Sequence, residues 1–216
     1  MGDDDPSKKS EIVAASPSEP PPIPNPFAVS AVRPGAIPFI FPAGTEAVDL
    51  IDALEDQHGW RGQIIGPHGS GKSTLLATLI PELEADGRRV LLYTLRDGQH
   101  SLPEGLRDAP HDKQPTILII DGYEQLKPTS RWCLRLVCRL RGWALLVTAH
   151  RDMGLPTLWR PAVSRELATS IVDRLLKKEL GQTIDPHQVE AALSRHDGNL
   201  RGVLFDLYDD FERGRR

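Results

Sequence analysis

Residues 62–79 read GQIIGPHGSGKSTLLATL, and positions 66–73 within them match the pattern G-x4-G-K-[S/T]. Residues 62–65 come directly before the pattern and are predicted to form a short strand. A helix is predicted to begin near Lys72 and to close at Gly87. Because the N-terminus of that helix faces the glycine-rich turn, this order predicts a loop shaped to hold an anion.

The residue types in the loop suit a polyphosphate group. Glycines at 66, 69 and 71 let the backbone wrap closely around phosphate oxygens and present its N–H groups to them. Lys72 can reach the β- and γ-phosphate oxygens, and the Ser73 hydroxyl can occupy one position in the octahedral shell of Mg²⁺. The expected nucleotide contacts are Gly66, Pro67, His68, Gly69, Ser70, Gly71, Lys72, Ser73 and Thr74.

Three further apolar runs have the length of strands that are buried on both faces of a parallel sheet: 89–95, 116–120 and 144–148. A helix predicted over 130–140 lies between the last two. This alternation of strand and helix predicts an α/β fold in which helices flank a parallel sheet.

Asp121 directly follows the strand predicted at 116–120. Its carboxylate is therefore expected at the C-terminal edge of a buried parallel strand, where ligands bind in open α/β sheets. We expect Asp121 to hold Mg²⁺ through water, together with Ser73. The alternative role is an aspartate that only caps the next helix.

The loop at 66–73 and Asp121 together resemble the Walker A and Walker B motifs of the additional-strand P-loop NTPases, a division that contains the AAA+ and STAND ATPases. The resemblance covers residues 36–213 and implies a P-loop NTPase sheet, ATP as the nucleotide and Mg²⁺ as the metal. AAA+ proteins usually place a glutamate after the Walker B aspartate to polarise the attacking water, whereas this chain has Gly122. The segment DGYEQL, beginning at Asp121, looks more like STAND-type ATPases and makes Glu124 the candidate base, with an exposed or helix-capping glutamate as the alternative.

The resemblance also implies roles for polar residues further along the chain. Families of this division place a sensor residue at the end of the next strand, where this chain has Thr148 and His150. The sequence GNLR at 198–201 is similar to the start of the last AAA+ lid helix, in which a sensor arginine, here Arg201, faces the nucleotide. A surface histidine and a solvated arginine are the alternatives. The catalytic candidates are Lys72, Glu124, Thr148, His150 and Arg201.

Composition divides the chain into three parts. Residues 1–35 are rich in proline and poor in large apolar side chains, which predicts a disordered tail. Residues 36–163 are expected to form the α/β core, including an early helix with Thr45 as its N-cap. Residues 164–216 are expected to form a small helical lid, with helices at 164–180, 186–195 and 200–212.

The helix at 130–140 lies in a segment that contains basic but no acidic residues. The basic side chains Arg131, Arg135 and Arg139 recur at helical spacing, and an opposing apolar stripe is formed by Trp132, Leu136 and Leu140. The favoured interpretation is a helix that packs by its apolar stripe and exposes its basic face to solvent. The alternative is a docking surface for nucleic acid or an acidic partner. Both cysteines, Cys133 and Cys138, are expected to be buried.

The overall composition excludes several classes of function. The chain has 216 residues and a formal net charge of −4, so strong general attraction to nucleic acid or to anionic membranes is not expected. No apolar run approaches the roughly 20 residues that cross a bilayer, and the N-terminal residues do not form a secretory signal. We therefore expect a soluble, cytoplasmic protein without a membrane partner.

These features lead to three functional hypotheses. The first is an ATP-binding and ATP-hydrolysing domain that acts as a nucleotide-dependent switch, with a protein partner or self-assembly. The second is a nucleotide-gated binding module with little turnover, which the glycine at 122 suggests. A P-loop kinase is the third and is less consistent with the GNLR segment. The chain after Arg151 has little room for the helix that carries the arginine finger in AAA+ proteins, so a hexameric motor is not expected.

Overall fold

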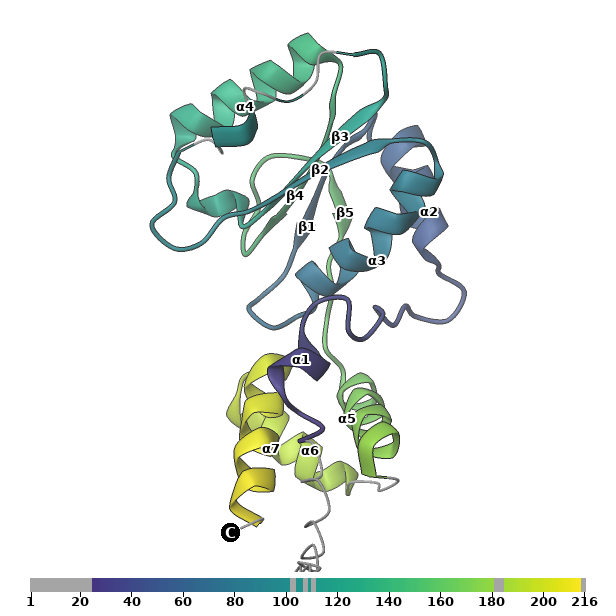
Figure 1. The fold of residues 1–216 in the computed structure, drawn as a ribbon, viewed down its shortest axis with the longest axis vertical. Coiled ribbons are helices and arrows are strands. Elements are labelled where there is room, and N and C mark those ends of the chain that lie inside the picture. The colour runs from purple at the N-terminus through teal and green to yellow at the C-terminus, as the bar shows by residue number, and fades with distance from the viewer. Residues whose placement is uncertain (1–24, 102–103, 107–108, 110–111, 181–184, 215–216) are drawn as a thin grey trace, which may run out of the picture.

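The computed structural model describes residues 25–101, 104–106, 109, 112–180 and 185–214. The chain forms an α/β part and a smaller helical part next to it (Figure 1). The sheet has five parallel strands in the order β2-β3-β4-β1-β5. The strands are β1 (Arg61–Ile65), β2 (Arg89–Thr94), β3 (Thr116–Asp121), β4 (Ala144–Ala149) and β5 (Thr157–Trp159).

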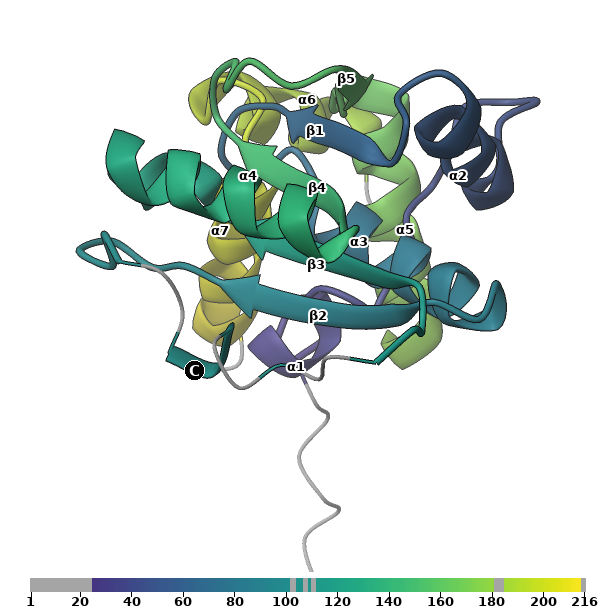
Figure 2. The same cartoon turned by 90° about the horizontal axis from the view of Figure 1, so that it is seen from above.

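Helices cover both faces of the sheet, as the alternation in sequence predicts. The helices α2 (Ala47–Asp56) and α3 (Lys72–Ala85) lie on one face, and α4 (Pro128–Arg141) lies on the other (Figure 2). Successive side chains of a strand point to opposite faces. In β3, Ile117 and Ile119 therefore pack with α2 and α3, whereas Leu118 and Ile120 pack on the side of α4.

The central strands match their prediction and the edge strand β2 does not. Residues 117–120 of β3 and all of β4 are buried, as expected for strands covered on both faces. In β2 the side chain of Leu92 is 47% exposed. The reason is that β2 forms the edge of the sheet beside β3, where helices cover it less completely.

The N-cap of α2 is Glu46 rather than Thr45. The Glu46 side chain accepts from the backbone of Asp49, and the Asp49 side chain accepts from the Glu46 backbone N–H at 2.7 Å. This reciprocal pair satisfies two backbone donors at the start of the helix. A glutamate can replace the usual short N-cap residue here because an aspartate stands at the third helical position.

The helical part consists of α5 (Arg165–Leu180), α6 (Pro186–Arg195) and α7 (Leu200–Gly214). Asp185 caps α6 by accepting from the His187 backbone N–H at 3.0 Å, and Pro186 occupies the first helical position. The three helices bury a separate apolar cluster that includes Val172, Val189 and Leu204. This arrangement agrees with the predicted helices.

Residues 25–35 do not belong to a disordered tail, contrary to the expectation for 1–35. They contain the short helix α1 (Val29–Val32), and Phe27 is only 3% exposed in the apolar cluster of the helical part. The Asn25 side chain donates hydrogen bonds to the Tyr208 carbonyl at 3.2 Å and to the Glu212 carboxylate at 2.8 Å. One large aromatic side chain and these polar contacts attach the segment to α7. Residues 1–24 lie outside the described residues.

The helix α4 is rotated relative to the prediction. Leu134 and Cys138 face the core, whereas Trp132 and Leu140 are 66% and 77% exposed. Arg131 and Arg135 turn inward instead, because the Tyr123 ring and carbonyl groups lie on that side. The Arg131 guanidinium donates to the Glu124 carbonyl at 2.7 Å, and the Arg135 guanidinium donates to the Met153 carbonyl.

These contacts correct two expectations. The three arginines do not form one open basic face, since Arg139 is exposed whereas Arg131 and Arg135 are partly buried. Cys133 is exposed, whereas Cys138 is buried and its burial raises the thiol pKa to about 11. In the part of the chain that the structure describes, no helix combines the length and the apolar character needed to cross a membrane.

Candidate nucleotide-binding site

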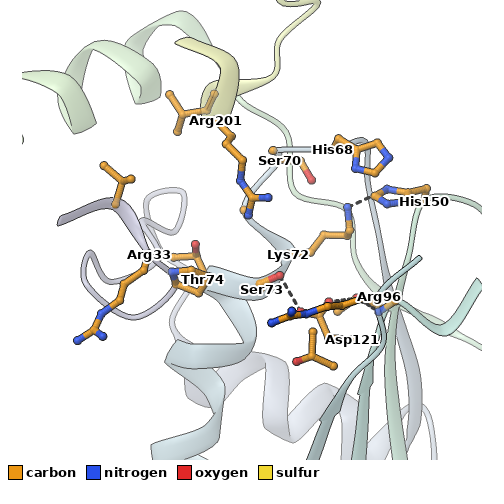
Figure 3. Close-up of a pocket in the computed structure, with 18 of the residues that line it drawn as sticks. Arg33, His68, Ser70, Lys72, Ser73, Thr74, Arg96, Asp121, His150 and Arg201 are labelled. Carbon is orange, nitrogen blue, oxygen red and sulfur yellow. Dashed lines mark hydrogen bonds between the residues drawn. The ribbon is translucent and has the colours of Figure 1, made fainter. Parts of the chain in front are cut away.

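The loop at 66–73 forms one wall of a cavity of about 700 Å³ at the C-terminal ends of the strands (Figure 3). The other walls come from the ends of β2, β3 and β4, from the N-terminus of α7 and from α1. Segments far apart in the sequence thus meet at the edge of the sheet where open α/β folds bind ligands.

The loop backbone has the geometry of an anion-binding cradle. Gly69 and Gly71 have φ angles of +69° and +91°, a region that glycine adopts without strain, and Gly71 forms the N-cap of α3. A Cβ atom at Gly66 would lie 2.6 Å from Ser70 Oγ and 3.3 Å from the Pro161 carbonyl oxygen, so a side chain there would force the loop or the Ser70 side chain to shift. Ser70 Oγ is buried and has no hydrogen-bond partner among the described residues. The cradle therefore suits a group that accepts hydrogen bonds, as phosphate does.

Lys72 lies at the centre of the cradle and is only 8% exposed. Its Nζ donates to the carbonyl oxygens of Gly66 at 2.7 Å and Pro67 at 2.8 Å, and lies 3.1 Å from Nδ1 of His150. Burial lowers the pKa of Lys72, while the carboxylates of Glu124 and Asp121 act in the opposite direction. A buried ammonium group held at this place provides a fixed positive charge for an anionic ligand.

Ser73, Asp121 and Thr148 form a connected group beside the cradle. The Ser73 hydroxyl donates to one Asp121 oxygen at 2.8 Å, and the Thr148 hydroxyl donates to the other at 2.5 Å. Thr148 Oγ1 also accepts from the Gly122 backbone N–H at 3.1 Å. The Thr148 hydroxyl therefore holds the Asp121 carboxylate and the Gly122 backbone in place, and Thr148 also lines the cavity.

Glu124 and His150 lie together on the other side of Lys72. Glu124 is in the short 3-10 turn η2 (Tyr123–Gln125), and its Oε1 is 3.2 Å from His150 Nε2. Glu124 Oε2 is buried without a hydrogen-bond partner among the described residues. The ring centroids of His68 and His150 are 3.7 Å apart. The pKa of His68 is lowered, mainly by burial and to a smaller extent by the charges of His150 and Lys72.

The helical part contacts the cradle directly. Arg201, in the first turn of α7, lines the same cavity and points toward the loop (Figure 3). A Cβ atom at Gly69 would overlap Asn199 Oδ1, which accepts from the Gly202 backbone N–H at 3.3 Å and so caps α7. The structure thus brings all five catalytic candidates to one cavity.

Sequence reasoning did not identify two groups of residues that line this cavity. Arg96 follows β2, and Arg33 lies just after α1, in a segment expected to be disordered. The second group is apolar and consists of Val29, Val32, Pro34, Leu200, Leu204 and Phe205. No local pattern marks these residues, because α1 and α7 meet only in the folded chain.

We expect Thr148→Val to destabilise the fold and to weaken metal-dependent ligand binding. Valine keeps the shape of threonine but removes the hydroxyl that satisfies Asp121 and the Gly122 N–H. Leaving these partners unpaired should cost about 1–3 kcal/mol of unfolding free energy. Chemical denaturation measures this cost, and Thr148→Ser, which keeps the hydroxyl, is the matched control. Equal stability of the valine and serine variants would contradict the positioning role.

Comparison with known proteins finds similarity in three dimensions only. No protein-family model matches the chain, and no curated protein matches it significantly. Among solved structures, ORC1 of Aeropyrum pernix in complex with DNA aligns with a TM-score of 0.62 at 15% identity, over 87% of this chain and 64% of that chain. AMPPCP-bound DnaA of Aquifex aeolicus aligns with a TM-score of 0.52 at 16% identity, over 78% and 62%. The Hsp104–ADP complex of S. cerevisiae aligns with a TM-score of 0.53 at 16% identity, over 86% and 32%.

These neighbours are AAA+ P-loop NTPases, and the chain spans less than two thirds of the length of each of the three. At sequence identities this low, structural similarity shows a shared fold and does not show a shared activity. The strand order, the loop between β1 and α3, and the helices that follow the sheet agree with the resemblance seen in the two motifs. The chain therefore has the fold of the AAA+ P-loop NTPases.

Proposed function

We propose that this domain binds ATP with Mg²⁺ and hydrolyses it, and that its helical part acts as a lid whose position depends on the bound nucleotide. The observation that carries the proposal is the convergence of Lys72, Asp121, Glu124 and Arg201 on one cavity that the P-loop lines. Two of the neighbouring structures, DnaA with AMPPCP and Hsp104 with ADP, hold an adenine nucleotide, which supports an adenine nucleotide as the ligand.

The residues beside the P-loop fit a divalent cation. The Ser73 hydroxyl and the Asp121 carboxylate are 2.8 Å apart, and hard oxygen donors of this kind are the ligands that Mg²⁺ prefers. A bound Mg²⁺ would neutralise charge on the β- and γ-phosphate oxygens. In the protein, Lys72 adds a second positive charge from the P-loop side, and Thr148 keeps the Asp121 carboxylate in place.

Glu124 is the residue that best fits the role of general base. Its buried Oε2 has no partner among the described residues, while His150 holds Oε1 and the Arg131 guanidinium holds the backbone carbonyl. A carboxylate oriented in this way can accept a hydrogen bond from a water molecule placed in line with the terminal phosphate. Gly122, at the position of the usual AAA+ glutamate, has no side chain for this purpose.

The apolar end of the cavity is the proposed site of the purine base. Val29 and Val32 of α1 line it together with Leu204 and Phe205 of α7, which are parts of two segments that pack against each other. Binding the base there would join the N-terminal segment, the lid and the P-loop. Because the lid also supplies Arg201, loss of the terminal phosphate would change how α7 is held, which is the proposed switch.

We expect Glu124→Gln to abolish phosphate release from Mg-ATP while ATP binding changes little. The amide keeps the shape of the carboxylate but cannot accept the proton of the attacking water. Phosphate release by the purified protein measures turnover, and nucleotide titration measures affinity. Glu84→Gln, on the exposed side of α3, is the matched control. Unchanged turnover in Glu124→Gln would contradict the role of this residue.

The second candidate function is a nucleotide-gated binding module with little turnover. Gly122 favours it, since the usual catalytic side chain is absent from that position. The described connection between β4 and β5, residues 150–156, contains no helix that could present an arginine finger to a neighbouring subunit. ATP binding that Lys72→Ala abolishes, without phosphate release by the wild type, would support this function over hydrolysis.

A further inference from the structure

The loop after β2 enters the nucleotide cavity beside Asp121. Thr94, the last residue of β2, pairs with Asp121 in the sheet, and the Leu95 backbone N–H donates to the Asp121 carbonyl at 2.8 Å. The next two residues, Arg96 and Asp97, both line the cavity. The path of the sheet edge therefore places an arginine directly next to the proposed metal site.

This loop occupies the space beside Gly122. A Cβ atom at Gly122 would lie 2.8 Å from the Leu95 carbonyl oxygen, and Gly122 has a φ angle of +88°. Both observations exclude an ordinary side chain at position 122. Gly122 stands where AAA+ proteins usually have a glutamate. In this chain that space is taken by the backbone that carries Arg96, so the two features are linked.

The loop is also attached to the segment that carries Glu124. The Gln125 side chain donates to the Asp97 carboxylate at 2.9 Å, and His100 Nδ1 lies 2.8 Å from the Gln125 carbonyl oxygen. The Arg96 backbone N–H donates to the Gln99 side chain at 2.7 Å, which closes the turn. These contacts fix the position of the loop relative to Glu124.

The Arg96 guanidinium itself is available for a ligand. Arg96 is exposed, and among the described residues its side chain forms no hydrogen bond or ion pair, since only its backbone groups are bonded. Figure 3 shows the side chain extended toward the end of the cavity where Ser73 and Asp121 lie. A guanidinium group in this place matches the oxygens of a phosphate in charge and in hydrogen-bond geometry.

We infer that Arg96 binds the terminal phosphate of ATP in the same subunit and takes the part of an arginine finger. This inference rests on the proposed function. In hydrolysis, water adds to the γ-phosphorus, its proton passes to the Glu124 carboxylate, and the bond from the γ-phosphorus to the ADP oxygen breaks, giving ADP and inorganic phosphate. Arg96 forms no bond and keeps its protons, and it stabilises the charge on the phosphoryl oxygens. The site then needs no arginine from a second copy of the chain.

The decisive experiment measures how well the protein distinguishes AMPPNP, which keeps a γ-phosphate, from ADP. We expect Arg96→Ala to weaken AMPPNP binding about tenfold, the value of one charge-assisted hydrogen bond, and to change ADP binding less than about twofold. Arg96→Lys should restore part of the difference. Arg139→Ala, on the exposed surface of α4, is the matched control and should leave both affinities unchanged.

A second variant tests the link to Gly122. Gly122→Ala keeps Arg96 but places a methyl group against the Leu95 carbonyl, so it should also reduce the preference for AMPPNP over ADP. An Arg96→Ala protein that keeps the wild-type preference would overturn the inference. If Lys72→Ala still abolishes binding in that case, only the role of Arg96 fails. If Lys72→Ala binds both nucleotides normally, the proposed function fails as well.

Discussion

Lys72→Ala is expected to weaken ATP binding about 100-fold or more, because the ammonium group would make at least two charge-assisted hydrogen bonds to phosphate. The side chain is almost fully buried and lies inside the loop whose backbone would surround the phosphates. A second source of positive charge cannot replace it, since Arg201 approaches from the lid rather than from the cradle. Titration with a fluorescent ATP analogue measures the loss directly.

The fold of this variant should remain intact. Burying the Lys72 ammonium group costs desolvation free energy, which is the main cause of its lowered pKa. Replacing Lys72 by alanine therefore removes a buried charge from the apoprotein. Circular dichroism and a denaturation curve verify this point, and Lys113→Ala, on the exposed surface, is the matched control. A Lys72→Ala protein that binds and hydrolyses ATP like the wild type would contradict the assignment of the cavity as a nucleotide site.

Gly69→Ala is expected to separate the lid from the P-loop. A methyl group at this position would overlap the Asn199 side chain, which caps α7, and the φ angle of +69° disfavours any L-residue. Overpacking of this kind costs about 1–3 kcal/mol, in addition to about 1–2 kcal/mol for the left-handed backbone. Because the same methyl group lies in the cradle, ATP affinity should fall together with the stability.

A matched control distinguishes the two costs. Gly154 has a φ angle of +71°, nearly that of Gly69, but a Cβ atom there would meet nothing within 4 Å. Gly154→Ala should therefore show the backbone cost alone in a denaturation experiment. Equal unfolding free energies for the Gly69→Ala and Gly154→Ala variants would mean that the lid does not pack tightly against the P-loop at Gly69. Limited proteolysis of the lid provides an independent measure of its attachment.

Local sequence alone was enough to predict the P-loop segment and the buried strands beside it. The strand, the glycine loop and the helix that begins at Lys72 form one continuous segment, and each residue type in it has a local reason. The buried strands β3 and β4 were predictable because a strand covered on both faces must be apolar throughout. Asp121 could be placed at the ligand edge for the same reason, since it ends such a strand.

Only the tertiary structure decided which surfaces meet. The amphipathic pattern of α4 allowed two orientations, and the structure exposes Trp132 because Arg131 and Arg135 find partners around Tyr123. Residues 25–35 become ordered because Phe27 finds an apolar cluster that three distant helices build.

The same distinction separates the predictable part of the site from the rest. Lys72 and Asp121 belong to motifs that are recognisable in a few residues, whereas Arg96 reaches the cavity through the pairing of β2 with β3. In the sequence, the glycine at 122 looked like a lost catalytic residue, but the nearby Leu95 carbonyl oxygen leaves no room there for a Cβ atom, which gives the glycine a structural reason. Spacing along the chain determines local geometry, but a contact between distant segments depends on strand order and packing, which no local pattern contains.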